Sequence, residues 1–139
     1  MRFVLGVDEA GRGPLAGPVA VGVIAVEEGF DILAAFPGLN DSKKLSEKKR
    51  EALFETLVEL SGAGLVRVTV TLKSAKEIDG RGIAVAIRMA TEEGIRKLMP
   101  ESSGGKVWLD GSLKAPDEYE QETVIGGDGV IPAIMLASI

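Results

Sequence analysis

The sequence predicts an α/β domain built on a mixed β-sheet, and three observations support this class. Apolar runs of strand length cover residues 2–8 and 18–26, and apolar stripes with helical spacing cover about 46–62 and 82–98. Shorter strand patterns lie between and after the helices. Such alternation is typical of a sheet covered by helices. The length of 139 residues fits one domain, so we assign residues 1–139 to a single domain.

The first half of the chain contains two strands, a helix and a third strand. A glycine-rich turn joins the apolar strand at 2–8 to the apolar run at 18–26. Ser46 is the predicted N-cap of a helix that ends near Gly62. The side chains expected on the buried side of this helix are Leu53, Leu57 and Leu60, with Phe54 alongside. Alternation in 65–72 predicts a half-buried strand. Its inward residues should be Val66, Val68 and Val70.

The second half adds a helix, two short strands and the start of another helix. The helix covers about 82–98, and the strands cover 106–110 and 123–125. The apolar stripe of the helix is Ile83, Ile87, Ala90, Ile95 and Leu98. Pro132 opens an apolar helical segment that reaches Ile139 without a cap or a polar last turn. Because a natural terminus usually reaches the surface, we expect a C-terminally truncated domain, and the alternative is a short buried strand at the C-terminus.

Composition excludes several classes of protein. No apolar run reaches the roughly 18 residues of a membrane span, and we expect no secretory leader. The absence of cysteine excludes disulfides, zinc fingers and thiol catalysis, and it agrees with a cytoplasmic location. The net charge of −5 argues only weakly against a nucleic-acid substrate, because Lys43, Lys44 and residues 48–50 form a local basic block.

Two aspartates stand where apolar strands end. Asp8 and Asp110 each precede a glycine-containing turn. A carboxylate at such a place needs a cation or a dense set of hydrogen bonds. The chain has no histidine or cysteine, so the expected cation is Mg²⁺ or Mn²⁺. Two cations roughly 4 Å apart suit in-line displacement at phosphorus. Glu9 joins Asp8 only if the strand ends between them, since neighbours on a strand point to opposite faces.

The turn after Glu9 is rich in glycine. Gly11, Gly13 and Gly17 let backbone groups approach a ligand closely. Their spacing matches neither the dinucleotide-binding fingerprint nor the P-loop. A tight turn between two strands explains the same glycines without any function. The loop alone therefore does not distinguish a ligand-binding loop from a structural turn.

In their order along the chain, these motifs resemble type 2 ribonuclease H (ribonuclease HII). The matching segments are Asp8–Gly13, Pro18-Val19, Asp41–Ser46, Asp110-Gly111, Gly127-Asp128, Ile131–Ile134 and Ala137–Ile139. They span essentially the whole chain. The resemblance implies a ribonuclease H-like fold, in which helices flank a central mixed β-sheet. It also implies a Mg²⁺- or Mn²⁺-dependent endoribonuclease that cleaves the RNA strand of RNA–DNA hybrids. Family members also nick duplex DNA 5′ to an embedded ribonucleotide.

Site residues follow from the resemblance position by position. Three of the family's four catalytic, metal-binding carboxylates correspond to Asp8, Glu9 and Asp110. The motif that reads the 2′-hydroxyl of the ribonucleotide corresponds to Gly11, Arg12 and Gly13. The expected phosphate contacts are Lys43 and Lys44.

The chain also departs from the family. The resemblance places the fourth carboxylate and a base-stacking tyrosine beyond Ile139, and the role of that tyrosine does not transfer to Tyr119. We therefore expect impaired activity. We also expect self-association of this chain, although the parent protein should be monomeric. Two other functions stay open: a non-catalytic fragment that binds hybrids, and a metal-dependent phosphatase or nucleotide-binding module.

Overall fold

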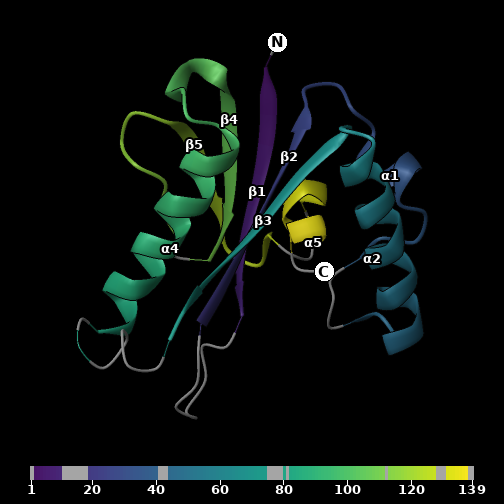
Figure 1. The fold of residues 1–139 in the computed structure, drawn as a ribbon, viewed down its shortest axis with the longest axis horizontal. Coiled ribbons are helices and arrows are strands. Elements are labelled where there is room, and N and C mark those ends of the chain that lie inside the picture. Colours follow the sequence, from purple (N-terminus) through teal and green to yellow (C-terminus); the bar gives the residue numbers. More distant parts are fainter. Residues whose placement is uncertain are drawn as a thin grey trace.

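A five-stranded mixed sheet forms the centre of the molecule (Figure 1). The computed structural model describes residues 2–10, 19–40, 44–74, 80, 82–111, 113–127 and 131–137. The strand order is β3-β2-β1-β4-β5. The bounds are β1 (Phe3–Ala10), β2 (Val19–Glu27), β3 (Val66–Lys73), β4 (Gly105–Asp110) and β5 (Glu120–Val124). The first three strands pair antiparallel, whereas β4 is parallel to both β1 and β5.

Helices cover both faces of this sheet, as the sequence predicts. The long helix α4 (Ile83–Leu98) lies on one face, and the short helix α5 (Pro132–Ala137) packs on β1 and β2 on the other (Figure 1). Two further helices, α1 (Ile32–Ala35) and α2 (Glu47–Gly62), lie on the α5 side. A single 3₁₀ turn, η2 (Ser102–Gly104), precedes β4. No helix in these ranges combines the length and apolar character needed to cross a bilayer.

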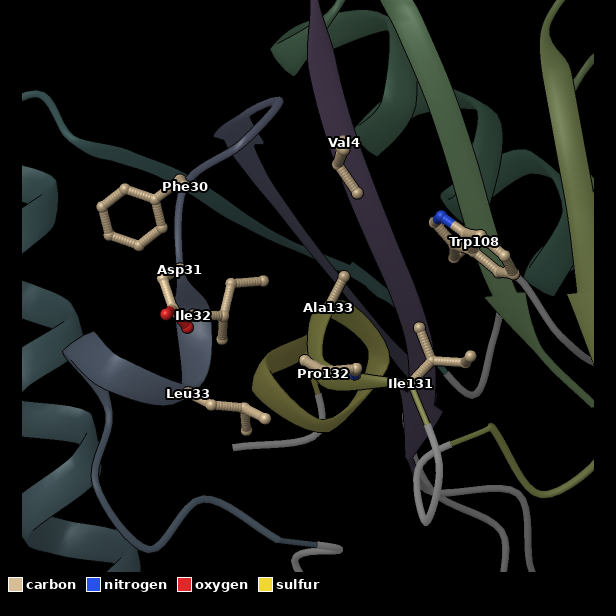
Figure 2. Close-up of a pocket in the computed structure, with 9 residues that line it drawn as sticks. All are labelled: Val4, Phe30, Asp31, Ile32, Leu33, Trp108, Ile131, Pro132 and Ala133. Atoms are coloured by element: carbon tan, nitrogen blue, oxygen red, sulfur yellow. The ribbon is translucent and has the colours of Figure 1, made fainter.

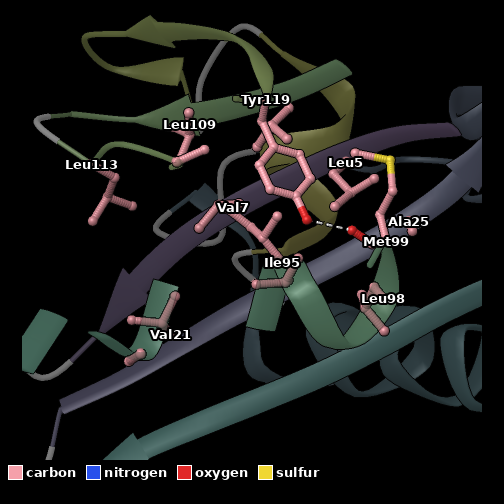
Figure 3. Packing of buried hydrophobic residues seen from close by; sticks show 14 of the residues in the cluster. Leu5, Val7, Val21, Ala25, Ile95, Leu98, Met99, Leu109, Leu113 and Tyr119 are labelled. Carbon is pink, nitrogen blue, oxygen red and sulfur yellow. Dashed lines mark hydrogen bonds between the residues drawn. The ribbon is translucent and has the colours of Figure 1, made fainter. Parts of the chain in front are cut away.

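The two faces of the sheet, named here the α4 face and the α5 face after the helices that cover them, carry separate cores. Strand residues on the α4 face pack in one cluster with α4; they include Leu5, Val7, Val21, Val107 and Leu109. Figure 3 shows part of this cluster, with Ile95 and Leu98 of α4. Alternate residues of the same strands pack with α1, α2 and α5; they include Val4, Ile24, Val26 and Val66. Because side chains alternate along a strand, each strand residue belongs to one face only.

Glycine allows α5 to lie directly on the sheet. A Cβ added at Gly6 would collide with the carbonyl of Ala133 in α5. A Cβ added at Gly22 of β2 would lie 2.8 Å from the carbonyl oxygen of Ala137. The helix backbone therefore touches the strand backbone at both ends of α5, which fixes its place beside the end of β1.

Several element boundaries and burials differ from the predictions. The N-cap is confirmed, since Ser46 Oγ accepts a hydrogen bond from the amide of Lys49 at 3.1 Å. Burial of Phe54 and Val70 was predicted wrongly: they are 54% and 59% exposed, because α2 turns other residues inward and no described element covers the end of β3. The last strand begins at Glu120 and ends at Val124 rather than covering 123–125. The four-residue helix α1 was missed because a single turn has no periodicity to detect.

Candidate metal centre

The ends of β1 and β4 bring two of the predicted carboxylates together. The two strands pair in parallel from Phe3↔Gly105 to Val7↔Leu109. One further step in this register places Asp8 beside Asp110. Asp8 pairs on its other side with Gly22, which contacts α5, so the aspartates share the α5 face. Neighbouring strands lie about 4.8 Å apart, which lets two carboxylates bind the same cation or a pair of cations.

One carboxylate oxygen of Asp110 is buried without a hydrogen-bond donor among the described residues. This oxygen is Oδ1. Gly127 lies directly beside it, since a Cβ at Gly127 would be 3.5 Å from this oxygen and 2.6 Å from Ile134 Cδ1. Leaving a carboxylate oxygen buried without a donor is costly, and a cation offsets that cost. The setting of Asp110 therefore fits a metal ligand.

Glu9 lies on the opposite face of the same strand end. The strand does not stop between Asp8 and Glu9, because Glu9↔Val21 and Ala10↔Ala20 continue the pairing with β2. Glu9 thus points to the α4 face, where its Oε2 is buried. Within the described part of the chain, no three groups among His, Cys, Asp and Glu are arranged to hold a metal. The structure therefore brings Asp8 and Asp110 together but does not bring Glu9 to them.

The chemistry of this site fits hard divalent cations. Its donors are carboxylate oxygens on two neighbouring strands, and Mg²⁺ is usually bound through one or two carboxylates, waters and substrate phosphates. The same oxygen set suits Mn²⁺. Two carboxylates leave most of the coordination shell to water and substrate, which is the arrangement that phosphoryl chemistry requires.

Most of the predicted substrate-binding residues fall outside the described ranges. These are Gly11, Arg12, Gly13 and Lys43. Lys44 is described and exposed, just before the N-cap of α2. The basic residues of the first turn of α2 are exposed as well. An exposed lysine at this position is free to meet a phosphate, where it acts as a point charge.

Tyr119 belongs to the core and not to the site. It is 3% exposed, and its hydroxyl donates a hydrogen bond of 2.6 Å to the carbonyl of Met99 (Figure 3). Burial raises the pKa of the Tyr119 phenol, and the nearby Arg96 guanidinium offsets part of that rise. Because Tyr119 is buried in the core on the α4 face, its ring is not available to stack on a base.

An apolar pocket of about 350 Å³ also opens on the α5 face. Figure 2 shows the side chains of Val4, Trp108 and Ile131 on one side of it, and those of Phe30 and Ile32 on the other. Of the predicted site residues that the structure describes, namely Asp8, Glu9, Lys44 and Asp110, none lines it. Its lining carries little polar chemistry, so it does not compete with the strand ends as the candidate reaction site.

Sequence and structure comparisons agree on one family. The family model described as Ribonuclease HII matches residues 5–139. The chain is 39% identical over 137 residues to the Ribonuclease HII of a Polaromonas species, covering 99% of this chain and 64% of that protein. It is 41% identical over 141 residues to the Ribonuclease HII of Shewanella loihica, covering 99% and 62%.

A solved structure gives the same result for the fold. The chain resembles a chain in the PCNA:RNase HII complex from Archaeoglobus fulgidus with a TM-score of 0.75 and 26% identity, over 97% of this chain and 68% of that one. The mixed sheet and its flanking helices thus match a ribonuclease H-like fold. The chain spans less than two thirds of the length of the two curated relatives, at 64% and 62%.

Proposed function

The chain belongs to the ribonuclease HII family, and we propose that it acts as a metal-dependent endonuclease on RNA–DNA hybrids and on duplex DNA with embedded ribonucleotides. The cut falls in the RNA strand of a hybrid and 5′ to a single ribonucleotide. Such an activity serves ribonucleotide excision during DNA replication and repair in the cytoplasm. The observation that carries the proposal is the pair of neighbouring carboxylates, Asp8 and Asp110, with a buried Asp110 oxygen.

Asp8 and Asp110 would hold Mg²⁺ or Mn²⁺ on the α5 face. A bound divalent cation lowers the pKa of a water molecule and neutralises the charge that develops on the phosphate. The two side chains would determine where the cation sits. Their strands, β1 and β4, are paired up to the residue before each carboxylate, which holds the two carboxylates in place relative to each other. Glu9 completes the proposed carboxylate set, and this requires the last residues of β1 to depart from the regular pleat.

Substrate recognition is assigned to the segments on either side of this centre. Gly11, Arg12 and Gly13 follow β1 directly in the sequence and would read the 2′-hydroxyl, the atom that distinguishes RNA from DNA. Lys43 and Lys44 would contact backbone phosphates. The exposure of Lys44 supports its part of this proposal.

We propose that this chain alone cleaves more slowly than its longer relatives. Only two carboxylates lie together in the described part, and the family resemblance places a further ligand beyond Ile139. A chain that lacks part of the ligand set still binds a hybrid through its lysines and glycine loop. Binding without cleavage is therefore the specific alternative.

The deciding experiment uses a labelled DNA duplex that carries one ribonucleotide. The purified chain is incubated with it in Mn²⁺, Mg²⁺ or chelator, beside an all-DNA duplex of the same sequence. We expect a metal-dependent nick 5′ to the ribonucleotide and none in the all-DNA duplex. Asp110→Asn is the matched variant, since it keeps the size of the side chain and removes its charge.

Three outcomes separate the alternatives. A nick that vanishes in Asp110→Asn supports the endonuclease and the assigned centre. Duplex binding that depends on the ribonucleotide, without any nick, supports the alternative of a non-catalytic fragment that binds hybrids. Hydrolysis of small phosphoesters with indifference to the 2′-hydroxyl would contradict both and favour a phosphatase.

A further inference from the structure

The connection between β4 and β5 is unusually short for two parallel strands. It leaves Asp110 through Gly111 and enters β5 at Glu120. Parallel neighbours usually need a crossover of about a dozen or more residues, often a helix. Here the crossover crosses the α4 face as irregular chain, and its buried side chains join the core there (Figure 3). They are Leu113, Ala115 and Tyr119, of which Figure 3 labels the first and the last.

An irregular segment packed on a core needs partners for its backbone groups. The side chain of Gln121 in β5 supplies four hydrogen bonds to the crossover. Its Oε1 accepts from the amide of Ala115 at 2.9 Å, and its Nε2 donates to the carbonyls of Ala115 and Pro116 at 3.1 Å each. A longer contact of 3.4 Å reaches the carbonyl of Tyr119. Gln121 pairs with Val107 in the sheet register, which places it on the α4 face.

Two further bonds continue this line of contacts toward Asp110. The hydroxyl of Thr123 donates to the carbonyl of Leu113 at 3.0 Å, and the amide of Gly111 donates to the carbonyl of Val124 at 3.2 Å. The segment after Asp110 therefore runs back along β5 and is held at residues 111, 113 and 115 in turn. The side chains of Gln121 and Thr123 in β5 thus make the hydrogen bonds to this segment that the backbone of a neighbouring strand would otherwise make.

The held segment includes the turn that begins at Asp110. The amide of Leu113 donates to the Asp110 carbonyl at 3.2 Å, which links these two residues across the turn that follows Asp110. Gly111 has φ +61°, a conformation that glycine adopts without strain. Because this turn restricts the backbone on the C-terminal side of Asp110, it also restricts the direction in which the Cα–Cβ bond of Asp110 leaves the strand.

We propose that Gln121 is a positioning residue for Asp110: its side-chain amide holds the returning segment against β5 and thereby keeps the Asp110 turn in register with Asp8. This inference rests on the proposed function, because the orientation of Asp110 matters only if Asp110 binds the cation. Gln121 contacts neither substrate nor cation in this role. It acts through Ala115 and the Asp110–Leu113 turn.

The test replaces Gln121 by methionine, which keeps the length of the side chain and removes all four hydrogen bonds. Tyr119→Phe is the matched control, since it removes the hydrogen bonds of the Tyr119 hydroxyl to the carbonyls of Met99 and Pro100 in the same core. Amide hydrogen exchange is measured in chelator, and the affinity for Mn²⁺ alone is measured by electron paramagnetic resonance. The thermal midpoint of each variant shows whether the two are comparably destabilised.

We expect Gln121→Met to raise the Mn²⁺ dissociation constant by about tenfold, the size typical for residues that orient a ligand. Exchange at Gly111 and Leu113 should speed up by a similar factor. Tyr119→Phe should leave both within about twofold of the unsubstituted chain. Unchanged exchange at Gly111 and Leu113 in Gln121→Met, or an equal loss of Mn²⁺ affinity in both variants, would overturn the inference.

Failure of the proposed function gives a different pattern. An unsubstituted chain that does not bind Mn²⁺, or that binds it equally well as Asp110→Asn, has no metal centre at Asp110. That result removes the proposed centre and the positioning role together, whatever the exchange rates show. Loss of Mn²⁺ binding in Asp110→Asn with normal binding in Gln121→Met leaves the proposed function intact and refutes only the role of Gln121.

Discussion

The two faces of the sheet differ in how completely they are covered. On the α4 face, a sixteen-residue helix and the β4–β5 crossover bury the strand side chains in one continuous cluster. On the α5 face, the helices α1, α2 and α5 cover part of the sheet, and the end of β3 lies open with Val70 and Leu72 at 59% and 63% exposure. The neighbouring carboxylates Asp8 and Asp110 are on the open face. In this molecule the α4 face holds the larger cluster of buried residues, and the more open α5 face carries the candidate chemistry.

The largest expected effect separates Asp8 from Glu9, which share a strand end and lie on opposite faces. Asp8→Asn should lower metal-dependent cleavage by about 10³-fold, because it removes a ligand charge from the centre. Glu9→Gln should lower it by about tenfold, since Glu9 reaches the centre only when the end of β1 departs from the pleat. Rates on the single-ribonucleotide duplex, measured with both variants at equal Mn²⁺, give the comparison.

Equal losses in these two variants would contradict the assignment of the carboxylates to different faces. They would mean that metal binding rearranges the end of β1 completely. A variant with normal cleavage would remove its residue from the proposed carboxylate set.

The next largest effect concerns the contact between α5 and the sheet, and it measures how much this contact contributes to the stability of the fold. Gly6→Ala should destabilise the fold by about 3 kcal/mol, because the added methyl group collides with the Ala133 carbonyl and neither backbone can move freely. Gly62→Ala is the control, since no atom lies within 4 Å of a Cβ added there. Urea unfolding of both variants measures the difference. A loss below about 0.5 kcal/mol for Gly6→Ala would show that α5 is loosely attached.

A smaller effect belongs to the α4 face and depends on pH. Burial raises the pKa of Tyr119 in the folded chain, so the unfolded chain releases this proton first as the pH rises. Tyr119 therefore makes its full contribution to the unfolding free energy below about pH 10, which is the pKa of tyrosine in the unfolded chain. This contribution is lost as the pH rises toward the higher pKa in the folded chain. Unfolding free energies between pH 8 and 11 should fall more steeply for the unsubstituted chain than for Tyr119→Phe. Parallel curves would refute the shift.

Strand and helix positions were predictable because their signals are local. Ser46 marks the start of α2 by its capping hydroxyl, and the apolar run of β1 identifies a central strand without knowledge of its neighbours. That Asp8 and Asp110 follow directly on the last paired residues of two neighbouring strands was anticipated from two strand ends followed by glycine. The face of Glu9 was not decided, because it depends on two extra pairs between β1 and β2. The role of Gln121 was missed, since nothing local in a polar strand shows which carbonyls a side chain will meet.

The smallest effect on stability, and the sharpest test of the open face, comes from the edge strand β3. Val70→Lys should change the unfolding free energy by less than about 0.5 kcal/mol, because the side chain is already 59% exposed. It should nevertheless reduce self-association, since β3 is an edge of the sheet and a charge on an edge strand opposes pairing with a second copy.

Light scattering at rising protein concentration measures that self-association, and Thr69→Val is the contrasting variant. Thr69 neighbours Val70 on the same strand but is 8% exposed on the α4 face, where a second copy has no access. If the open face causes association, only Val70→Lys shifts the chain toward monomer. A shift of equal size in both variants would instead trace association to the strand as a whole, and the contrast between the two faces would then concern packing alone.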